Sequence, residues 1–169
     1  MLEQHLTELE QLKFRRGLRV IMKNLLISAT IYLSSYLLGI FFHVLVAHGC
    51  YFMIRYFSFG AHLKNFWLCF VQSWLTFVGV PFLLVYKLDL RLLIPGLLAA
   101  AAICWLGPQP TRAQPIHAYM LEPLKLKVRV TVGILLLVSL IIPNGYRLMM
   151  YYGIIVQALT LVITYMRRN

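Results

Sequence analysis

Acidic residues are scarce in this chain of 169 residues, which carries 5 Asp and Glu against 16 Lys and Arg and has a formal net charge of +11. Glu3, Glu8 and Glu10 lie at the N-terminus, which leaves only Asp89 and Glu122 for the rest of the chain. An aspartic protease needs two aspartates, and paired-carboxylate catalysis needs two carboxyl groups at one place. The scarcity of acids therefore argues against both.

Sequence motifs for metal-dependent hydrolysis and for ATP use are also missing. The chain contains neither an HExxH pattern nor a GxxxxGK loop. Its three cysteines, Cys50, Cys69 and Cys104, are an odd number without CxxC spacing, which indicates free thiols. We therefore expect a protein without a cofactor or a metal ion.

Charged residues of either sign make up only 12% of the chain, whereas 61% of it is hydrophobic. Soluble globular proteins are about a quarter charged, so too little polar surface is present to cover a soluble fold. The Lys and Arg residues lie in short clusters between long apolar runs, which is not the solvated basic face of a nucleic-acid-binding protein. The composition predicts an all-α integral membrane protein that contacts the lipid bilayer and no nucleic acid.

Long apolar runs define the expected membrane segments. One membrane crossing needs about 20 helical residues. The run 25–54 has thirty residues without a formal charge, which is long for one helix and short for two. Further apolar runs follow at residues 66–86, 92–106, 130–143 and 148–166.

The positions of the basic residues predict the topology. The N-terminal segment, the loop 107–129 and the C-terminus are basic, so the positive-inside rule places all three in the cytosol. Residues 25–54 must then leave the cytosol and return, with a short, tilted or re-entrant second segment between about His43 and Arg55. We expect about six membrane helices, a multi-pass chain and two cytosolic termini.

Residues 1–23 place apolar side chains among acids first and bases later, an order that suits the helix dipole. They are expected to form an N-terminal amphipathic helix on the cytosolic face of the membrane. A charged lead-in to the first span fits the same pattern. The expected organisation is a single membrane domain over residues 1–169, made of the amphipathic segment 1–23 and a helical membrane core over 24–169.

The joint between the second and third expected segments contains residues suited to nucleophilic catalysis. It reads RYFSFGAHLKNFWLC, from Arg55 to Cys69. The imidazole of His62 can take the proton of the Cys69 thiol, and the thiolate can attack a peptide carbonyl to give a thioester. The nearby charges of Arg55 and Lys64 favour the thiolate. From spacing alone, a His and a Cys that only pack in the membrane remain the alternative.

The separation of seven residues limits how this pair can meet. On one unbroken helix, His62 and Cys69 would share a face but lie about 10 Å apart along the axis, too far for a hydrogen bond. The helix must therefore break between them. Gly60 supplies the flexible point, and Asn65 can cap a helix that begins just after it.

The stretch SFGAHLKNFWLC resembles the signature of the accessory gene regulator B family, integral-membrane cysteine endopeptidases of Gram-positive bacteria. That family carries a Gly-x-His hinge and a Cys seven residues after the His, and Gly60, His62 and Cys69 stand in those places. The basic start, the central loop with prolines and lysines, and the basic end are also similar, so the resemblance covers nearly the whole chain. It implies that His62 and Cys69 are the catalytic residues.

The resemblance also implies a reaction and a partner. Members of this family process a quorum-sensing pheromone precursor, a peptide whose acidic C-terminal tail is cut off. The implied function is cleavage of that tail through a Cys acyl-enzyme thioester and cyclisation of the peptide to a thiolactone or lactone, at the bacterial cell membrane. Family members often work as dimers, so a homodimer is also implied. A non-catalytic membrane peptide exporter or scaffold is the alternative function.

Other residues are candidates for supporting the reaction. Gln72 lies on the same helical face as Cys69 and could orient the His or donate to an oxyanion, or else form a packing hydrogen bond between helices. Ser58 and Gly60 are further supporting candidates. Five basic residues are candidates for binding the acidic precursor, although the last three are first expected to anchor the membrane boundary: Arg55, Lys64, Lys125, Lys127 and Arg129.

Overall fold

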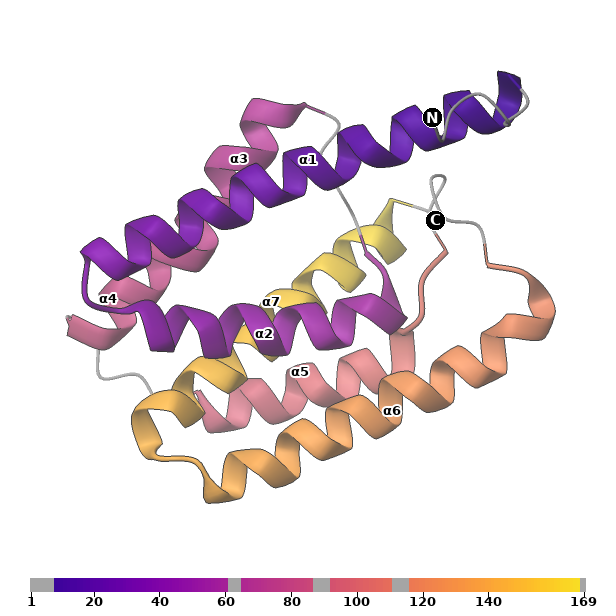
Figure 1. The fold of residues 1–169 in the computed structure, drawn as a ribbon. Helices are drawn as coiled ribbons and strands as arrows, with labels where there is room; N and C mark the ends of the chain where they lie inside the picture. Colours follow the sequence, from indigo (N-terminus) through magenta and orange to yellow (C-terminus); the bar gives the residue numbers. More distant parts are fainter. Residues whose placement is uncertain (1–7, 61–64, 87–91, 111–115, 168–169) are drawn as a thin grey trace.

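The computed structural model describes residues 8–60, 65–86, 92–110 and 116–167, and every regular element in these ranges is a helix (Figure 1). The elements α3, η2 and α4 follow one another in a single rod over Phe66–Tyr86, so the described chain forms six helical rods. The all-α prediction is confirmed. The elements are α1 (Glu8–Leu37), α2 (Phe41–Ser58), α3 (Phe66–Trp74), the π-helical turn η2 (Leu75–Gly79), α4 (Val80–Tyr86), α5 (Leu93–Leu106), α6 (Ala118–Ile141) and α7 (Asn144–Met166).

Several helices have the length and composition of membrane spans. Large apolar side chains such as Leu33 and Ile141 are exposed on the rods, as expected where lipid replaces water as the solvent. Together these features describe a membrane protein. The stretches long and apolar enough to cross a membrane are Gly17–Leu37, Phe66–Tyr86 and Asn144–Met166, with 21, 21 and 23 residues.

The thirty-residue apolar run 25–54 is divided by a turn at Gly39. Helix α1 ends at Leu37, Gly39 adopts a φ of 72°, which favours glycine, and α2 starts at Phe41. Helix α2 then runs back beside α1 (Figure 1). The run therefore forms two antiparallel helices, the second of them short with 18 residues.

The predicted N-terminal amphipathic helix is not a separate element. Helix α1 continues without a break from Glu8 to Leu37, so the described part of the segment 1–23 belongs to the same 30-residue helix as the first expected membrane segment. Residues 18–37 contain neither Gly nor Pro that could end a helix. The expectation of two helices here was wrong.

The expected loop 107–129 is helical in its second part. Helix α6 begins at Ala118, and Leu121, Leu124 and Val128 recur along it at helical spacing, with Val128 fully buried. Pro123 lies inside this helix without ending it. Helix α6 therefore starts well before the apolar run 130–143.

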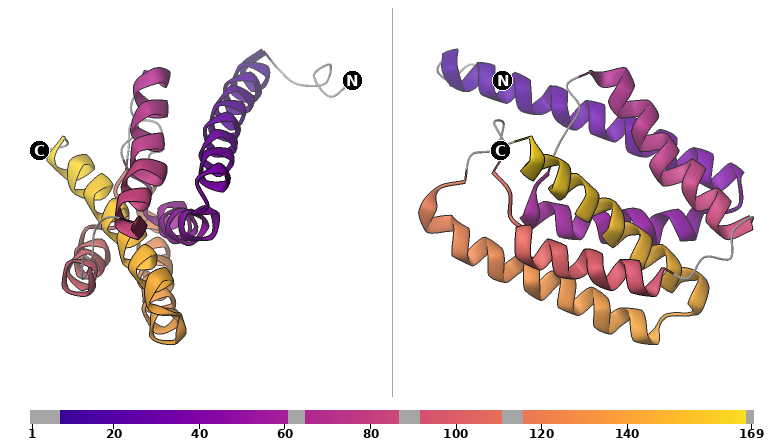
Figure 2. Two further views of the ribbon diagram at one scale, coloured as in Figure 1. Left: turned by 90° about the vertical axis from the view of Figure 1, so that its left-hand side faces the viewer. Right: turned by 180° about the vertical axis from the view of Figure 1, so that it is seen from behind.

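Helix α2 lies at the centre of the packing and contributes to all three buried apolar clusters. Its Ile54 packs with α5, α6 and α7, its Val44 with α1 and η2, and its Ala47 with α4 and α7. The left view of Figure 2 shows α1 and the α3–α4 rod rising apart from the group formed by the other four helices. Most of the core is therefore organised around α2.

Helix α7 approaches its neighbours closely at two glycines. A Cβ atom on Gly153 would collide with the carbonyl oxygen of Ala47 in α2, and a Cβ atom on Gly96 of α5 would lie 2.6 Å from the ring of Tyr151 in α7. Small residues at such contacts allow the backbones of membrane helices to approach one another. These two glycines therefore set the spacing of α2, α5 and α7.

We predict that Gly153→Ala lowers the free energy of unfolding by about 1–3 kcal/mol, because the added methyl group has no room against Ala47. Gly133→Ala is the matched control, since a Cβ atom on this glycine of α6 would have nothing within 4 Å. The control should be neutral or stabilising, because alanine favours helices. Unfolding in detergent measures both variants, and an unchanged stability of Gly153→Ala would contradict the close contact.

Candidate functional site

The helix breaks between the positions of the predicted catalytic pair. Helix α2 ends at Ser58 and α3 begins at Phe66, so no single helix runs through both positions. This agrees with the geometric requirement drawn from the sequence. His62 and Lys64 lie outside the described residues, so the contact between the His62 imidazole and the Cys69 thiol stays a prediction.

Asn65 is the N-cap of α3, as predicted. Its side-chain oxygen accepts hydrogen bonds from the backbone N–H groups of Trp67 at 2.9 Å and Leu68 at 3.5 Å. Cys69 follows in the first turn, where its own N–H donates to the Asn65 carbonyl at 3.0 Å. Cys69 therefore lies in the first turn of α3, at the positive end of the helix dipole.

The Cys69 side chain is half-buried and packs against the apolar cluster formed by α1, α2 and η2. Tyr51 of α2 packs against the same cluster. The guanidinium carbon of Arg55 lies 5.3 Å from the centre of the Tyr51 ring. The structure thus brings a thiol and a phenol into one apolar cluster, with a cation against the ring of the phenol.

The chain leaves α2 through two residues with positive φ. Phe59 has φ 60° and ψ −148°, a strained conformation for a non-glycine residue, and Gly60 has φ 138°. The Arg55 guanidinium donates to the Gly60 carbonyl at 3.4 Å. A Cβ atom on Gly60 would lie 2.9 Å from Oγ1 of Thr160. Glycine is therefore required here by both backbone conformation and close approach.

A fully buried glutamine of α7 holds this turn in place. Nε2 of Gln157 donates to Oγ of Ser58 and to the carbonyl of Phe59, each at 2.7 Å. Its Oε1 accepts from Oγ1 of Thr160 at 3.0 Å. The Ser58 hydroxyl in turn donates to the Ile54 carbonyl at 2.8 Å. Ser58 is therefore a buried part of the turn that leads toward His62.

Gln157 and Tyr51 are not among the residues predicted from the sequence. An amide within the apolar run 148–166 costs free energy unless it is hydrogen-bonded, and this is the signal that points to Gln157. Tyr51 precedes Arg55 by four residues and shares its helical face. Neither signal identifies the residues that Gln157 and Tyr51 contact, because these contacts depend on how α2 packs against α3 and α7.

The remaining predicted residues occupy different surroundings. Gln72 is exposed on α3, one turn beyond Cys69. On α6, Nζ of Lys125 pairs with the Glu122 carboxylate at 2.8 Å, Nζ of Lys127 lies 5.8 Å from the centre of the Phe57 ring of α2, and Arg129 is exposed. Among the residues that the structure describes, no group of three His, Cys, Asp or Glu side chains could hold a metal ion.

Comparisons with known proteins point to one family. The family model described as Accessory gene regulator B matches residues 2–163. The chain is 34% identical over 160 residues to the accessory gene regulator protein B of Staphylococcus intermedius, covering 94% of this chain and 85% of that protein. The protein of the same name from Staphylococcus carnosus is 33% identical over 154 residues, with 89% and 80% covered. No solved structure matches the chain significantly.

We predict that Gln157→Leu lowers the free energy of unfolding by about 1–2 kcal/mol, because the Phe59 carbonyl and the Ser58 hydroxyl lose a buried donor. It should also raise the hydrogen exchange of backbone amides around Phe59. Leu159→Ala, at an exposed position of the same helix, is the control and should change neither quantity. Exchange measured by mass spectrometry in lipid nanodiscs tests this, and unaltered protection around Phe59 would show that the amide does not hold the turn.

Proposed function

Because the chain belongs to the accessory gene regulator B family, which acts in quorum sensing, we propose that it is a membrane-embedded cysteine endopeptidase. Its substrate is the pheromone precursor peptide, from which it removes an acidic C-terminal tail. The observation that best supports this activity is the position of Cys69. A half-buried thiol lies on the first turn of α3, directly after a helix break, at the Gly-x-His and Cys spacing that the family carries.

The first step transfers the peptide to Cys69. His62 takes the thiol proton, and the sulfur attacks the carbonyl carbon at the cleavage point. The C–N bond then breaks, the proton passes from His62 to the leaving nitrogen, and the tail departs with a free amino group. The rest of the precursor remains bound to Cys69 as a thioester.

The second step closes the ring. A thiol or hydroxyl group of the peptide attacks the thioester carbonyl, which forms a thiolactone or lactone and returns the proton to the Cys69 sulfur. The activated acyl bond passes from the enzyme to the product, so this step requires no ATP. Water must be kept from the thioester, and a site at the membrane boundary favours its exclusion.

The surrounding residues support these steps. Arg55 supplies positive charge against the ring of Tyr51, which packs against the same cluster as Cys69. Ser58 and Gly60 form the turn from which the chain continues to His62. An excess of basic residues on the cytosolic side complements the acidic tail. The basic residues proposed to bind the precursor are Arg55, Lys64, Lys125, Lys127 and Arg129.

The same proposal includes six membrane passes with both termini in the cytosol, and two copies of the chain acting as a dimer.

We predict that reporters fused to either terminus are cytosolic, whereas a reporter inserted before Asn144, in the turn between α6 and α7, is external. The basic N-terminal and C-terminal segments are the physical reason, because such segments stay inside. Fusions to two reporters, one active only in the cytosol and one active only outside, measure the location of each position. Termini on opposite sides would contradict an even number of passes.

We predict that Cys69→Ser and His62→Ala each lower the rate of tail release by at least about a thousandfold, because each removes a member of the reacting pair. Cys50→Ser and Cys104→Ser are the matched controls and should remain active. The assay mixes the chain in lipid with a synthetic precursor and follows the released tail by mass spectrometry. An acyl adduct on Cys69 is expected during turnover.

Unchanged processing by either Cys69→Ser or His62→Ala would rule out this mechanism. Export of the peptide without cleavage by the unmodified chain would favour the exporter or scaffold instead.

A further inference from the structure

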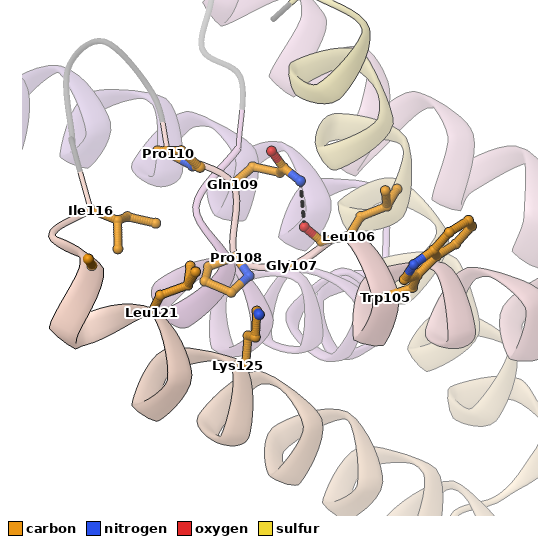
Figure 3. Close-up of a pocket in the computed structure, with 10 residues that line it drawn as sticks. Trp105, Leu106, Gly107, Pro108, Gln109, Pro110, Ile116, Leu121 and Lys125 are labelled. Carbon is orange, nitrogen blue, oxygen red and sulfur yellow. Dashed lines mark hydrogen bonds between the residues drawn. The ribbon is translucent and has the colours of Figure 1, made fainter. Parts of the chain in front are cut away.

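A pocket with a volume of about 340 Å³ lies between the segment that follows α5 and the first turns of α6 (Figure 3). This volume is at the lower end of the range for ligand pockets. Most of the described lining is apolar, and the one charged side chain among these described residues comes from α6. The lining includes Trp105, Pro108, Pro110, Ile116, Leu121 and Lys125.

The wall of this pocket is joined to the turn that leaves α2. The backbone N–H of Gln109 donates to the Ser58 carbonyl at 3.1 Å. A Cβ atom on the neighbouring Gly107 would lie 3.4 Å from Cβ of Ser58. Ser58 is also the residue whose hydroxyl accepts from Gln157. A peptide held in the pocket therefore lies next to the turn that ends α2.

The hydrogen-bond donors at the pocket indicate what it can bind. The N–H of Gly107 donates to the Ile103 carbonyl at 2.8 Å, and Nε2 of Gln109 donates to the Leu106 carbonyl at 2.6 Å, the dashed line in Figure 3. Pro108 and Pro110 have no N–H. Phosphate sites are built from several free N–H groups, and along Gly107–Pro110 these groups are engaged or missing. This wall of the pocket therefore suits an apolar side chain better than a lipid phosphate.

Lys125 favours a ligand that carries a negative charge. Its side chain is 33% exposed and pairs with Glu122, which is 77% exposed. An ion pair this exposed contributes little free energy, so a second carboxylate can compete for the ammonium group. Lys127 and Arg129 add further positive charge on the same helix. The ligand that fits is a peptide with an apolar residue next to an acidic one.

We propose that this pocket is the subsite for the acidic tail of the precursor. An apolar side chain of the tail enters between Pro108, Ile116 and Leu121, and an adjacent carboxylate pairs with Lys125. This inference rests on the proposed function and specifies where the substrate is held. Anchoring the tail here keeps the bond to be cleaved near the α2–α3 break while the acyl group is transferred.

Leu121→Trp tests the apolar part of the subsite, because the larger ring fills the pocket. Met120→Trp places the same ring at the neighbouring position, which is 42% exposed and outside the lining. Both changes are made in the Cys69→Ser chain in nanodiscs, so that binding of a fluorescent precursor with an acidic tail is measured without turnover. We expect Leu121→Trp to weaken binding at least about tenfold and Met120→Trp to leave it within about twofold.

Lys125→Gln tests the charged part of the subsite with two peptides, the acidic precursor and a copy in which each Asp and Glu of the tail is Asn or Gln. The substitution should weaken binding of the acidic peptide about fivefold and leave binding of the amide peptide unchanged. Equal effects on both peptides would overturn the pairing with Lys125. If a Leu121→Trp variant that is correctly folded by circular dichroism binds the peptide as before, the assignment of this pocket as the tail subsite is overturned.

Nanodiscs with and without phosphatidylglycerol separate a peptide site from a lipid site. A loss of peptide binding by Leu121→Trp in both lipids supports the proposal, whereas a loss confined to the anionic lipid would assign the pocket to lipid and overturn it. The result is independent of the catalytic proposal. If Leu121→Trp made in the chain that keeps Cys69 cleaves normally while Cys69→Ser is inactive, only the subsite is wrong. If Cys69→Ser still cleaves while Leu121→Trp weakens binding, only the catalytic mechanism is wrong.

Discussion

The contact between α2 and α7 is the interaction on which the rest of the structure depends. At its centre, Gly153 allows the backbones of the two helices to meet at Ala47. At its end, the buried amide of Gln157 binds the last turn of α2 through Ser58 and Phe59. Van der Waals packing holds membrane helices together where no hydrophobic effect acts between them, and the hydrogen bonds of Gln157 then fix the rotation and the depth of α2.

The position of α2 determines the geometry of the candidate site. The strained backbone at Phe59 persists because Gln157 and Arg55 bind the turn on both sides of it. Six residues after Phe59, Asn65 caps the next helix, so Cys69 lies near a helix N-terminus in the same cluster as Tyr51. A candidate nucleophile held in this way needs little rearrangement before it reacts. The same turn contacts the segment after α5, which joins the candidate tail subsite to the candidate nucleophile.

Local features of the sequence predicted local features of the structure. The apolar runs predict the helical class, and the conformational freedom of glycine predicts the turn within residues 25–54. Capping chemistry predicts the N-cap at Asn65. The start of α6 at Ala118 and the continuity of α1 were not predicted, because charged flanks were taken as helix boundaries. The partner of Gln157 and the pocket near Lys125 depend on contacts between segments far apart in the chain, and a single sequence carries no information on such contacts.

The polar residues of the interior also explain why His62 is the imidazole proposed for catalysis. His48 is buried and shares a hydrogen bond of 2.9 Å with the Tyr32 hydroxyl, so it acts as a tie between α1 and α2. His43 stacks on Tyr146 with ring centres 4.8 Å apart, and twelve residues of helix separate it from Arg55, a distance of about 18 Å. Neither histidine of α2 is therefore the base proposed for Cys69, which is His62 of the α2–α3 connection.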